Sequence, residues 1–278
     1  MKNFFKHAGL AAGYLVLFFG VQVWAGSMFA LGGLLPALFG GTADFESAYA
    51  GVYAALDRNL YLVQLLCYAA LLLLLYALLL MQAGRPIRAQ FRLVRPRSLK
   101  LLWIPALLGF AAYAAVSAGL ALLPPELPAM QEYFDAASKL STGGPLALEV
   151  IAVALGAPLV EEIVFRGLIY GEMKKVMPRA VALIAQALLF GWVHGQLIWS
   201  AFTFALGLLL GLVADEFDSI LPSILLHLCF NAANYIPYAF ALDSGGILVT
   251  LLASLAAVGA LLFILLRQRL RRPRLAQP

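Results

Sequence analysis

The chain has 278 residues, of which 63% are hydrophobic and only 12% are charged. Ordinary globular domains have roughly 45–50% apolar and about 25% charged residues, so this composition excludes a soluble globular domain and favours a polytopic membrane protein. The net charge of +5 is explained by basic loops that meet anionic lipid headgroups, and we expect membrane lipids but no nucleic acid among the partners.

Continuous apolar runs mark the predicted transmembrane elements. Runs of about 20 residues are long enough to cross the hydrocarbon as helices, and the Leu- and Ala-rich runs lack the alternation of barrel strands. We therefore predict an all-α transmembrane bundle of about eight helices that forms a single domain over residues 1–278. The sixth run is short, so seven helices or a re-entrant pair is the alternative. The predicted spans are 8–35, 59–81, 101–123, 146–170, 180–198, 200–214, 219–240 and 246–266.

The charged connections predict the orientation of the bundle. Lys and Arg gather between Arg85 and Lys100 and again between Arg267 and Arg274, whereas the connections over 44–57 and 126–139 are acidic on balance. The positive-inside rule places basic connections in the cytoplasm. We therefore expect a multi-pass protein whose two termini are both cytoplasmic.

Polar side chains interrupt three of the predicted spans. An ionised side chain at bilayer depth costs several kcal/mol, so such residues are expected to face a protein or water-filled interior and to serve a function. A helix rise of about 1.5 Å per residue puts all three sets in one slab about 10 Å thick. Pro158 removes a backbone hydrogen bond just before the first set and should kink that helix. The residues of the three motifs are Glu161, Glu162, Arg166, Phe190, His194, His227 and Asn231.

Spacing within the fourth span separates two neighbouring acids. Glu162 and Arg166 lie four residues apart, so they share a helix face and can form an ion pair. Glu161 points away from that face and is left without this partner. A desolvated carboxylate without a counter-ion suits a general base. We predict that Glu161, assisted by His194, activates a water molecule that attacks a peptide carbonyl.

The seventh span supplies the groups that complete this mechanism. His227 and Asn231 are also four residues apart, so an imidazole and an amide lie on one side of the helix. Both can donate hydrogen bonds to a developing oxyanion. No Ser or Cys nucleophile with a matched base is evident. The sequence therefore predicts peptide hydrolysis without a covalent intermediate.

The motifs Glu-Glu-x-x-x-Arg, Phe-x-x-x-His and His-x-x-x-Asn, in this order, resemble the CPBP family of intramembrane endopeptidases. This family includes type II CAAX prenyl endopeptidases and bacterial bacteriocin-processing or abortive-infection proteins. The resemblance covers residues 145–240, the predicted catalytic core. It implies a helical membrane protease with a cavity open toward the cytosol. It also implies catalytic roles for Glu161, His194, His227 and Asn231, with Glu162, Arg166 and Phe190 in support.

The same resemblance sets our expectations for location and partners. We expect an integral protein of a bacterial inner or plasma membrane. Its substrate is expected to be a peptide or a lipidated peptide, reached from the membrane or the cytosolic side. No recognition sequence for a particular substrate is visible outside the three motifs.

Three alternatives remain open at this point. Glu161, His194 and His227 could supply three zinc ligands and leave a fourth position open, as in catalytic zinc sites. However, the His-Glu-x-x-His pair is absent, and we expect no resident cofactor. Buried acids beside basic groups also mark transport pathways, although no inverted repeat is visible. A scaffold or immunity protein with a decayed site is the third alternative.

Overall fold

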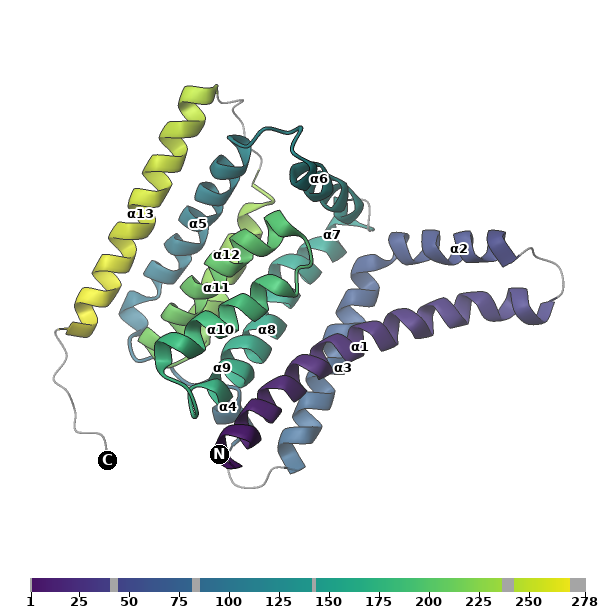
Figure 1. The fold of residues 1–278 in the computed structure, drawn as a ribbon, viewed down its shortest axis with the longest axis horizontal. Helices are drawn as coiled ribbons and strands as arrows, with labels where there is room; N and C mark the ends of the chain where they lie inside the picture. The colour runs from purple at the N-terminus through teal and green to yellow at the C-terminus, as the bar shows by residue number, and fades with distance from the viewer. Residues whose placement is uncertain (1, 41–44, 82–85, 142–143, 237–242, 271–278) are drawn as a thin grey trace.

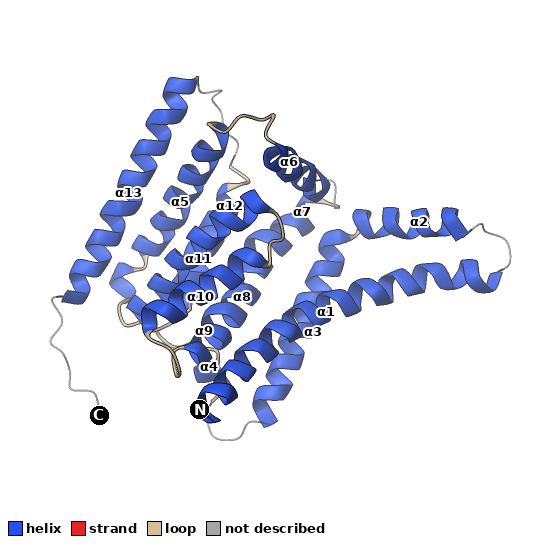
Figure 2. Cartoon of the chain, viewed as in Figure 1, coloured by secondary structure: helices blue, strands red, loops and turns tan. Residues whose placement is uncertain are grey.

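A computed structural model describes residues 2–40, 45–81, 86–141, 144–236 and 243–270. Within these ranges every regular element is helical, as Figure 2 shows. Residues 146–173 form one continuous helix, here called the Glu161 helix, which contains two π-helical stretches. The elements are α1 (Lys2–Gly40), α2 (Phe45–Arg58), α3 (Leu60–Met81), α4 (Ile87–Gln90), a 3₁₀ turn (Leu99–Leu101), α5 (Trp103–Ala121), α6 (Pro128–Ser141), α7 (Leu146–Glu149), a π-helical stretch (Val150–Gly156), α8 (Ala157–Glu161), a second π-helical stretch (Glu162–Ile169), α9 (Tyr170–Met173), α10 (Arg179–Trp192), α11 (Leu197–Phe217), α12 (Leu221–Ala233) and α13 (Ser244–Leu270).

The predicted all-α, multi-pass membrane fold is confirmed over the described residues. Apolar helices occupy all eight predicted positions: α1, α3, α5, the Glu161 helix, α10, α11, α12 and α13. Five candidate spans among the described residues are long and apolar enough to cross a membrane, namely those of α1, α3, α5, α11 and α13, whereas α10 and α12 are shorter apolar helices.

Several predicted boundaries were wrong. The fifth span ends at Trp192 rather than at 198, so His194 lies in the turn that follows α10. The sixth, predicted as a short run over 200–214, is the 21-residue helix α11. The connections over 44–57 and 126–139 largely form the helices α2 and α6, each of which buries one apolar side chain, Val52 and Met130. Residue 44, residues 237–240 of the seventh span, Arg85 and the tail after Leu270 lie outside the described residues.

The long helix α3 shows why these segments suit a membrane. Cys67, Leu71, Leu75 and Leu79 are buried at a spacing of four residues, so one stripe of the helix packs against its neighbours. The opposite face leaves apolar side chains uncovered, and Leu73 is 70% exposed. An apolar face of this size on a folded protein indicates contact with lipid.

The helices are arranged as a main bundle with an arm beside it. Figure 1 shows that α1, α2 and α3 form this arm, which leans away from the other helices. Only the N-terminal part of α1 and one face of α3 meet the Glu161 helix.

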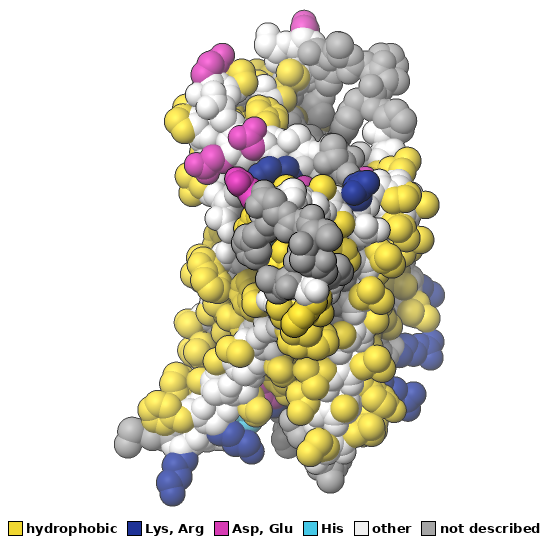
Figure 3. All heavy atoms as spheres, turned by 90° about the vertical axis from the view of Figure 1, so that its right-hand side faces the viewer, with side chains coloured by type: hydrophobic (Ala, Val, Ile, Leu, Met, Phe, Trp, Pro, Cys, Tyr) yellow, Lys and Arg dark blue, Asp and Glu magenta, His cyan; other side chains and the backbone are white. Residues whose placement is uncertain are grey.

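The two ends of the bundle differ in charge. The end with the turn after α9 carries Lys and Arg, whereas α6 at the other end carries Glu132, Asp135 and Lys139 and is acidic on balance. Figure 3 shows a broad apolar area on one face, with acidic side chains gathered toward one end and Lys and Arg both beside these acids and farther down.

The basic end is closed by a segment that crosses the helix ends. This segment, residues 86–102, includes the described part of the basic stretch between Arg85 and Lys100 and is called here the basic connection. The Ile220 amide donates to Arg92 O at 3.2 Å, the Arg97 amide donates to Phe217 O at 3.1 Å, and the Ser219 hydroxyl donates to Val94 O at 2.6 Å. These bonds join the basic connection to the turn between α11 and α12.

Asp215 neutralises much of the positive charge at this end. Its carboxylate lies 2.6 Å from Lys174 Nζ, 2.7 Å from Arg179 Nε and 3.6 Å from Arg92 Nη2. Burial lowers the pKa of Lys174, and the nearby Arg92 lowers it further, while the bond to Asp215 acts in the opposite direction. Asp215, in the last turn of α11, is therefore held by the bases around it.

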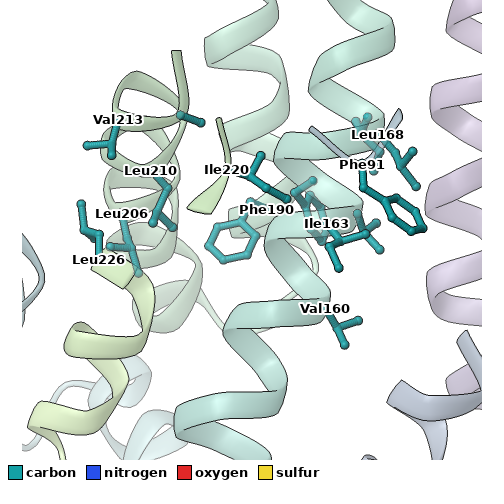
Figure 4. Packing of buried hydrophobic residues seen from close by; sticks show 14 of the residues in the cluster. Phe91, Val160, Ile163, Leu168, Phe190, Leu206, Leu210, Val213, Ile220 and Leu226 are labelled. Carbon is teal, nitrogen blue, oxygen red and sulfur yellow. The ribbon is translucent and has the colours of Figure 1, made fainter. Parts of the chain in front are cut away.

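A continuous apolar core holds the helices of the bundle together. Figure 4 shows Phe190 of α10 among buried aliphatic side chains from the Glu161 helix, α11 and the start of α12, such as Ile163, Leu210 and Ile220. Phe190 is fully buried. This core surrounds the predicted polar residues and fixes the relative positions of the helices that carry them.

Candidate active site

The Glu161 helix departs from α-helical geometry before Pro158 and again from Glu162 onward, so the second π-helical stretch contains Glu162 and Arg166. A π-helical stretch bonds each amide to the carbonyl five residues earlier, but Pro158 has no N–H to offer to Val153 O. The Asn231 side-chain amide of α12 donates to that carbonyl at 2.8 Å. Pro158 thus leaves the Val153 carbonyl without its helical donor. The hydrogen bond to this carbonyl fixes the position of the Asn231 side chain.

The two neighbouring glutamates occupy different environments, as their spacing predicts. Glu162 and Arg166 are fully buried, and their ion pair spans 2.9 Å. Glu161 has no such pair and keeps 14% of its side chain exposed. Glu161 is therefore the acid that water or a substrate can reach.

Arg166 is held by more than Glu162. Its guanidinium carbon lies 4.0 Å above the centre of the Phe190 ring, a cation–π contact. It also donates to Gly207 O at 3.4 Å, the carbonyl that Gln186 Nε2 reaches at 3.0 Å. Gly207 permits this approach because a Cβ there would lie 3.1 Å from Ala187 Cα. The charge of Arg166 is thus balanced within the bundle.

Phe190 connects this ion pair to both imidazoles. Its ring meets the rings of His194 and His227 edge to face, with centroids 5.0 and 5.9 Å apart. His194 Nδ1 lies 2.7 Å from Phe190 O, so Nδ1–H donates to this carbonyl. The other ring nitrogen of His194, Nε2, is then an acceptor and can take a proton.

His227 lies between the two glutamates, a contact that the spacing within a single helix did not predict. Its Nδ1 lies 3.1 Å from Glu162 Oε1, and its Nε2 lies 3.9 Å from Glu161 Oε2. Glu162 therefore orients the ring as well as pairing with Arg166. This arrangement directs Nε2 toward Glu161.

One cavity of about 330 Å³ brings the predicted residues together. Glu161, His194, His227 and Asn231 all line it, and so does Phe190. Glu162 and Arg166 lie behind them and do not line the cavity. The four groups predicted to act on a peptide bond therefore share one space.

Sequence reasoning missed the opposite wall of this cavity. The arm supplies Gln22 from α1 and Tyr61, Gln64 and Tyr68 from α3. The Tyr68 ring lies close to the Glu161 helix, since a Cβ at Gly156 would lie 3.1 Å from it. Amides and tyrosines are ordinary residues in apolar helices, so only their position after folding marks them.

The zinc alternative does not fit the residues as they are placed. Among the described residues, no group of three His, Cys, Asp or Glu side chains is close enough to hold a metal ion. Glu161, His194 and His227 belong to these described residues. We therefore derive no step through a metal.

The fold and the site together define a class: a multi-pass helical membrane protein with a carboxylate, imidazoles and an amide around a cavity inside its bundle. Residues 143–233 match the family model for type II CAAX prenyl endopeptidases of the Rce1-like kind, the family that the three motifs resemble. The match supports an intramembrane endopeptidase of the CAAX-protease type. No curated protein and no solved structure matches the chain.

Proposed function

We propose that this protein hydrolyses a peptide bond within the membrane by means of a water molecule activated by Glu161 and His194. The observation that carries this proposal is the shared cavity, which Glu161, His194, His227 and Asn231 line together. The family match supports the endopeptidase activity. The roles of the individual residues are our assignment from geometry.

Glu161 and His194 serve as the proton acceptors in this mechanism. A water molecule between them loses a proton to Glu161 as its oxygen attacks the peptide carbonyl. His194 Nε2 accepts a hydrogen bond from the same water, because its Nδ1–H is already donated to Phe190 O. The proton on Glu161 then passes to the leaving amine, so the carboxylate is restored.

His227 and Asn231 stabilise the tetrahedral intermediate. One Asn231 N–H is donated to Val153 O, which leaves the second for the oxyanion. His227 bonds Glu162 through Nδ1, so its Nε2 donates when the ring is an imidazolium. Donors placed before the reaction contribute more than donors that must reorganise.

The proposed substrate is a peptide or a lipidated peptide presented at a bacterial inner or plasma membrane. Lipids are the surrounding solvent of the bundle, and neither a nucleic acid nor a resident cofactor is part of the mechanism. The catalytic core is assigned to residues 145–240 within a single domain over 1–278.

Cleavage by a Glu161→Gln variant tests the proposal. Purified protein in detergent is incubated with a peptide library, and products are identified by mass spectrometry. We expect Glu161→Gln to lower the rate of every cleavage by about 10²–10⁴-fold, the usual contribution of a general base. Glu172→Gln, on the same helix but outside the cavity, is the matched control and should keep the activity. Full activity of Glu161→Gln would refute the mechanism.

Two further measurements separate the alternatives. Glu162→Gln is expected to reduce cleavage less than Glu161→Gln, because a glutamine can still accept from His227. Dialysis against a strong chelator, followed by metal analysis, should leave the wild-type activity unchanged. Activity that is lost on chelation and restored by zinc would instead establish a metal-dependent enzyme.

A further inference from the structure

A second cavity lies at the basic end of the bundle, between the start of α1, the basic connection and the end of the Glu161 helix. Figure 1 shows the N-terminus of α1 beside α4 and α9 at this end. The cavity has a volume of about 700 Å³, and none of the described residues that line it also lines the cavity of Glu161. It is therefore a separate space. We call it the basic cavity after four of its lining residues, Lys6, Arg92, Lys174 and Lys175.

Basic side chains outnumber acidic ones in the wall of the basic cavity. Among the described residues that line it, Glu172 is the acid that faces these four bases. Both of its carboxylate oxygens are already engaged. One contacts His7 Nδ1, and the other lies 2.5 Å from Lys175 Nζ. The charge of Glu172 is thus balanced locally, and the remaining bases give the cavity a positive sign.

Arg92 has no carboxylate at hydrogen-bonding distance within the described part of the chain. Its Nη2 lies 3.6 Å from Asp215 and 3.8 Å from Asp218, both of which are too far for such a bond. The guanidinium instead donates to Arg166 O at 3.3 Å and to Ala214 O at 3.4 Å. These bonds hold the group in place and leave some of its five N–H donors for a ligand.

Lys6 is the second base that is available to a ligand. It is exposed on α1, and no ion pair of its ammonium group is found among the residues that the structure describes. Lys174, by contrast, lies 2.6 Å from Asp215. An unpaired ammonium group and a weakly paired guanidinium beside one cavity attract an anion.

The basic cavity is polar at its outer end and apolar farther in. Lys6, Leu10 and Tyr14 line it at a spacing of four residues, so one face of α1 forms this wall. With a rise of about 1.5 Å per residue, the wall is about 12 Å long. Lys6 is exposed, whereas Tyr14 is buried, and Leu168 of the Glu161 helix adds a buried apolar side chain. Such a cavity suits an amphiphile with an anionic head.

The surroundings of the basic cavity favour a lipid as this amphiphile. Phe5, which precedes Lys6 on α1, is 69% exposed, and apolar side chains left open in this way indicate contact with lipid. The cavity therefore lies where the apolar surface of the helices meets charged side chains, at the level of the headgroups. Basic pockets between transmembrane helices are known to bind the headgroups of anionic lipids.

We propose that the basic cavity binds the phosphate headgroup of an anionic phospholipid. Lys6 and Arg92 supply the donors to the phosphate oxygens, while Leu10 and Leu168 contact the glycerol and the first acyl carbons. The phosphate chemistry is shared with soluble phosphates, and the apolar inner wall is what favours the lipid. Headgroups line both faces of a membrane, so the inference requires neither a particular orientation nor the proposed peptide hydrolysis.

Native mass spectrometry of the full chain, delipidated in detergent, tests the site. Phosphatidylglycerol and phosphatidylcholine are the probes, because both contain a phosphodiester but only the first has a net negative charge. We expect one molecule of phosphatidylglycerol to bind about tenfold more tightly than phosphatidylcholine, since each base near a headgroup contributes about fivefold. Equal affinities for the two lipids would overturn the proposal.

Two exposed bases separate the site from a general charge effect. Lys6→Gln should weaken the binding of phosphatidylglycerol by about fivefold. Arg95→Gln is the matched control, because Arg95 is exposed on the basic connection and does not line the basic cavity. It removes the same charge and should leave the affinity unchanged. An equal loss in both variants, or no loss in Lys6→Gln, would contradict a defined site.

Gly171→Leu tests the space in the cavity without changing any charge. Gly171 lines the basic cavity, and a Cβ there would meet nothing within 4 Å, so the longer side chain extends into open space. We expect this variant to lose the preference for phosphatidylglycerol while its helical circular dichroism is retained. A folded Gly171→Leu with the wild-type preference would overturn the proposed position of the lipid. If this variant does not fold, the comparison of Lys6→Gln with Arg95→Gln decides.

Thermal unfolding distinguishes a lipid from a soluble phosphate. A ligand that binds only the folded protein raises its melting temperature. Phosphatidylglycerol should therefore raise the melting temperature of the wild type, and this rise should be smaller in Lys6→Gln. Glycerol 3-phosphate at the same concentration should have little effect, because it lacks the acyl chains that reach the apolar wall. An equal rise with glycerol 3-phosphate would show that the ligand is a soluble phosphate and would overturn the assignment to a lipid.

Discussion

The main bundle and the arm contribute to the same cavity but are held in very different ways. In the most apolar stretch of α11, 44% of the residues are buried inside the protein, whereas in the corresponding stretch of α1 only 6% of the residues are buried. The bundle side contains a buried ion pair, a cation–π contact and close helix crossings. The arm side contributes a few tyrosines and amides from helices that are mostly open to lipid. We infer that the bundle holds the proposed catalytic groups in position and that the arm affects which substrates the cavity accepts.

The largest expected effect comes from removing a charge from the bundle side. Arg166→Met leaves Glu162 buried without its counter-ion at 2.9 Å. Breaking a buried pair in this way costs about 3–5 kcal/mol. We therefore expect a clear fall in the melting temperature of the purified protein, together with loss of activity because Glu162 also orients His227.

The double variant Glu162→Gln/Arg166→Met serves as the control. It removes both charges, so no uncompensated ion is left inside the bundle, and replacing both partners of a buried pair is often close to neutral. Most of the lost stability should return. If the single and double variants melt at the same temperature, the pair is not what holds this region together.

A smaller effect is expected where the basic connection meets the Glu161 helix. A Cβ at Gly167 would lie 2.7 Å from Phe91 O, whereas a Cβ at Gly171, one turn further on, would meet nothing within 4 Å. Overpacking of a tight contact costs typically about 1–3 kcal/mol. Gly167→Ala should therefore lower the melting temperature.

Gly171→Ala is the matched control for this contact. Alanine is the better helix former by about 0.8–1.0 kcal/mol, so this variant should be neutral or slightly stabilised. Thermal unfolding of both variants in the same detergent provides the comparison. An equal response of the two glycines would show that the basic connection does not press on the Glu161 helix as described.

The contrast between the main bundle and the arm also explains which features of the site the sequence could predict. Glu161, Arg166 and the two histidines stand out because charged and ionisable side chains are rare in apolar spans. The pair between Glu162 and Arg166 follows from their spacing on one helix. The contact between Glu162 and His227 does not, because spacing within a helix says nothing about which residues face it from another helix.

Local geometry was the other source of errors. The predicted end of the fifth span at 198 ignored the turn that Gly195 makes with a φ of +78°. The two acidic connections lack long apolar runs, so a search for transmembrane spans does not reveal the short amphipathic helices α2 and α6. α6 supplies Leu140 to the wall of the cavity that Glu161 lines. The tyrosines of the arm carry no unusual sequence signal at all.

The smallest expected effect lies on the arm. Tyr68 lines the cavity opposite Glu161, and Tyr68→Phe removes only its hydroxyl. This hydroxyl shares a hydrogen bond with Gln64. A further hydrogen bond between it and water or substrate contributes about 0.5–1.5 kcal/mol, which corresponds to ~2–12-fold in kcat/KM. The melting temperature should not change, because the ring still packs against Gly156. Tyr76→Phe is the control, since Tyr76 is 49% exposed on the same helix and does not line the cavity. A loss of stability without a change in kcat/KM would contradict this prediction. It would show that Tyr68 stabilises the fold, as the buried residues of the bundle do, and does not act on the substrate.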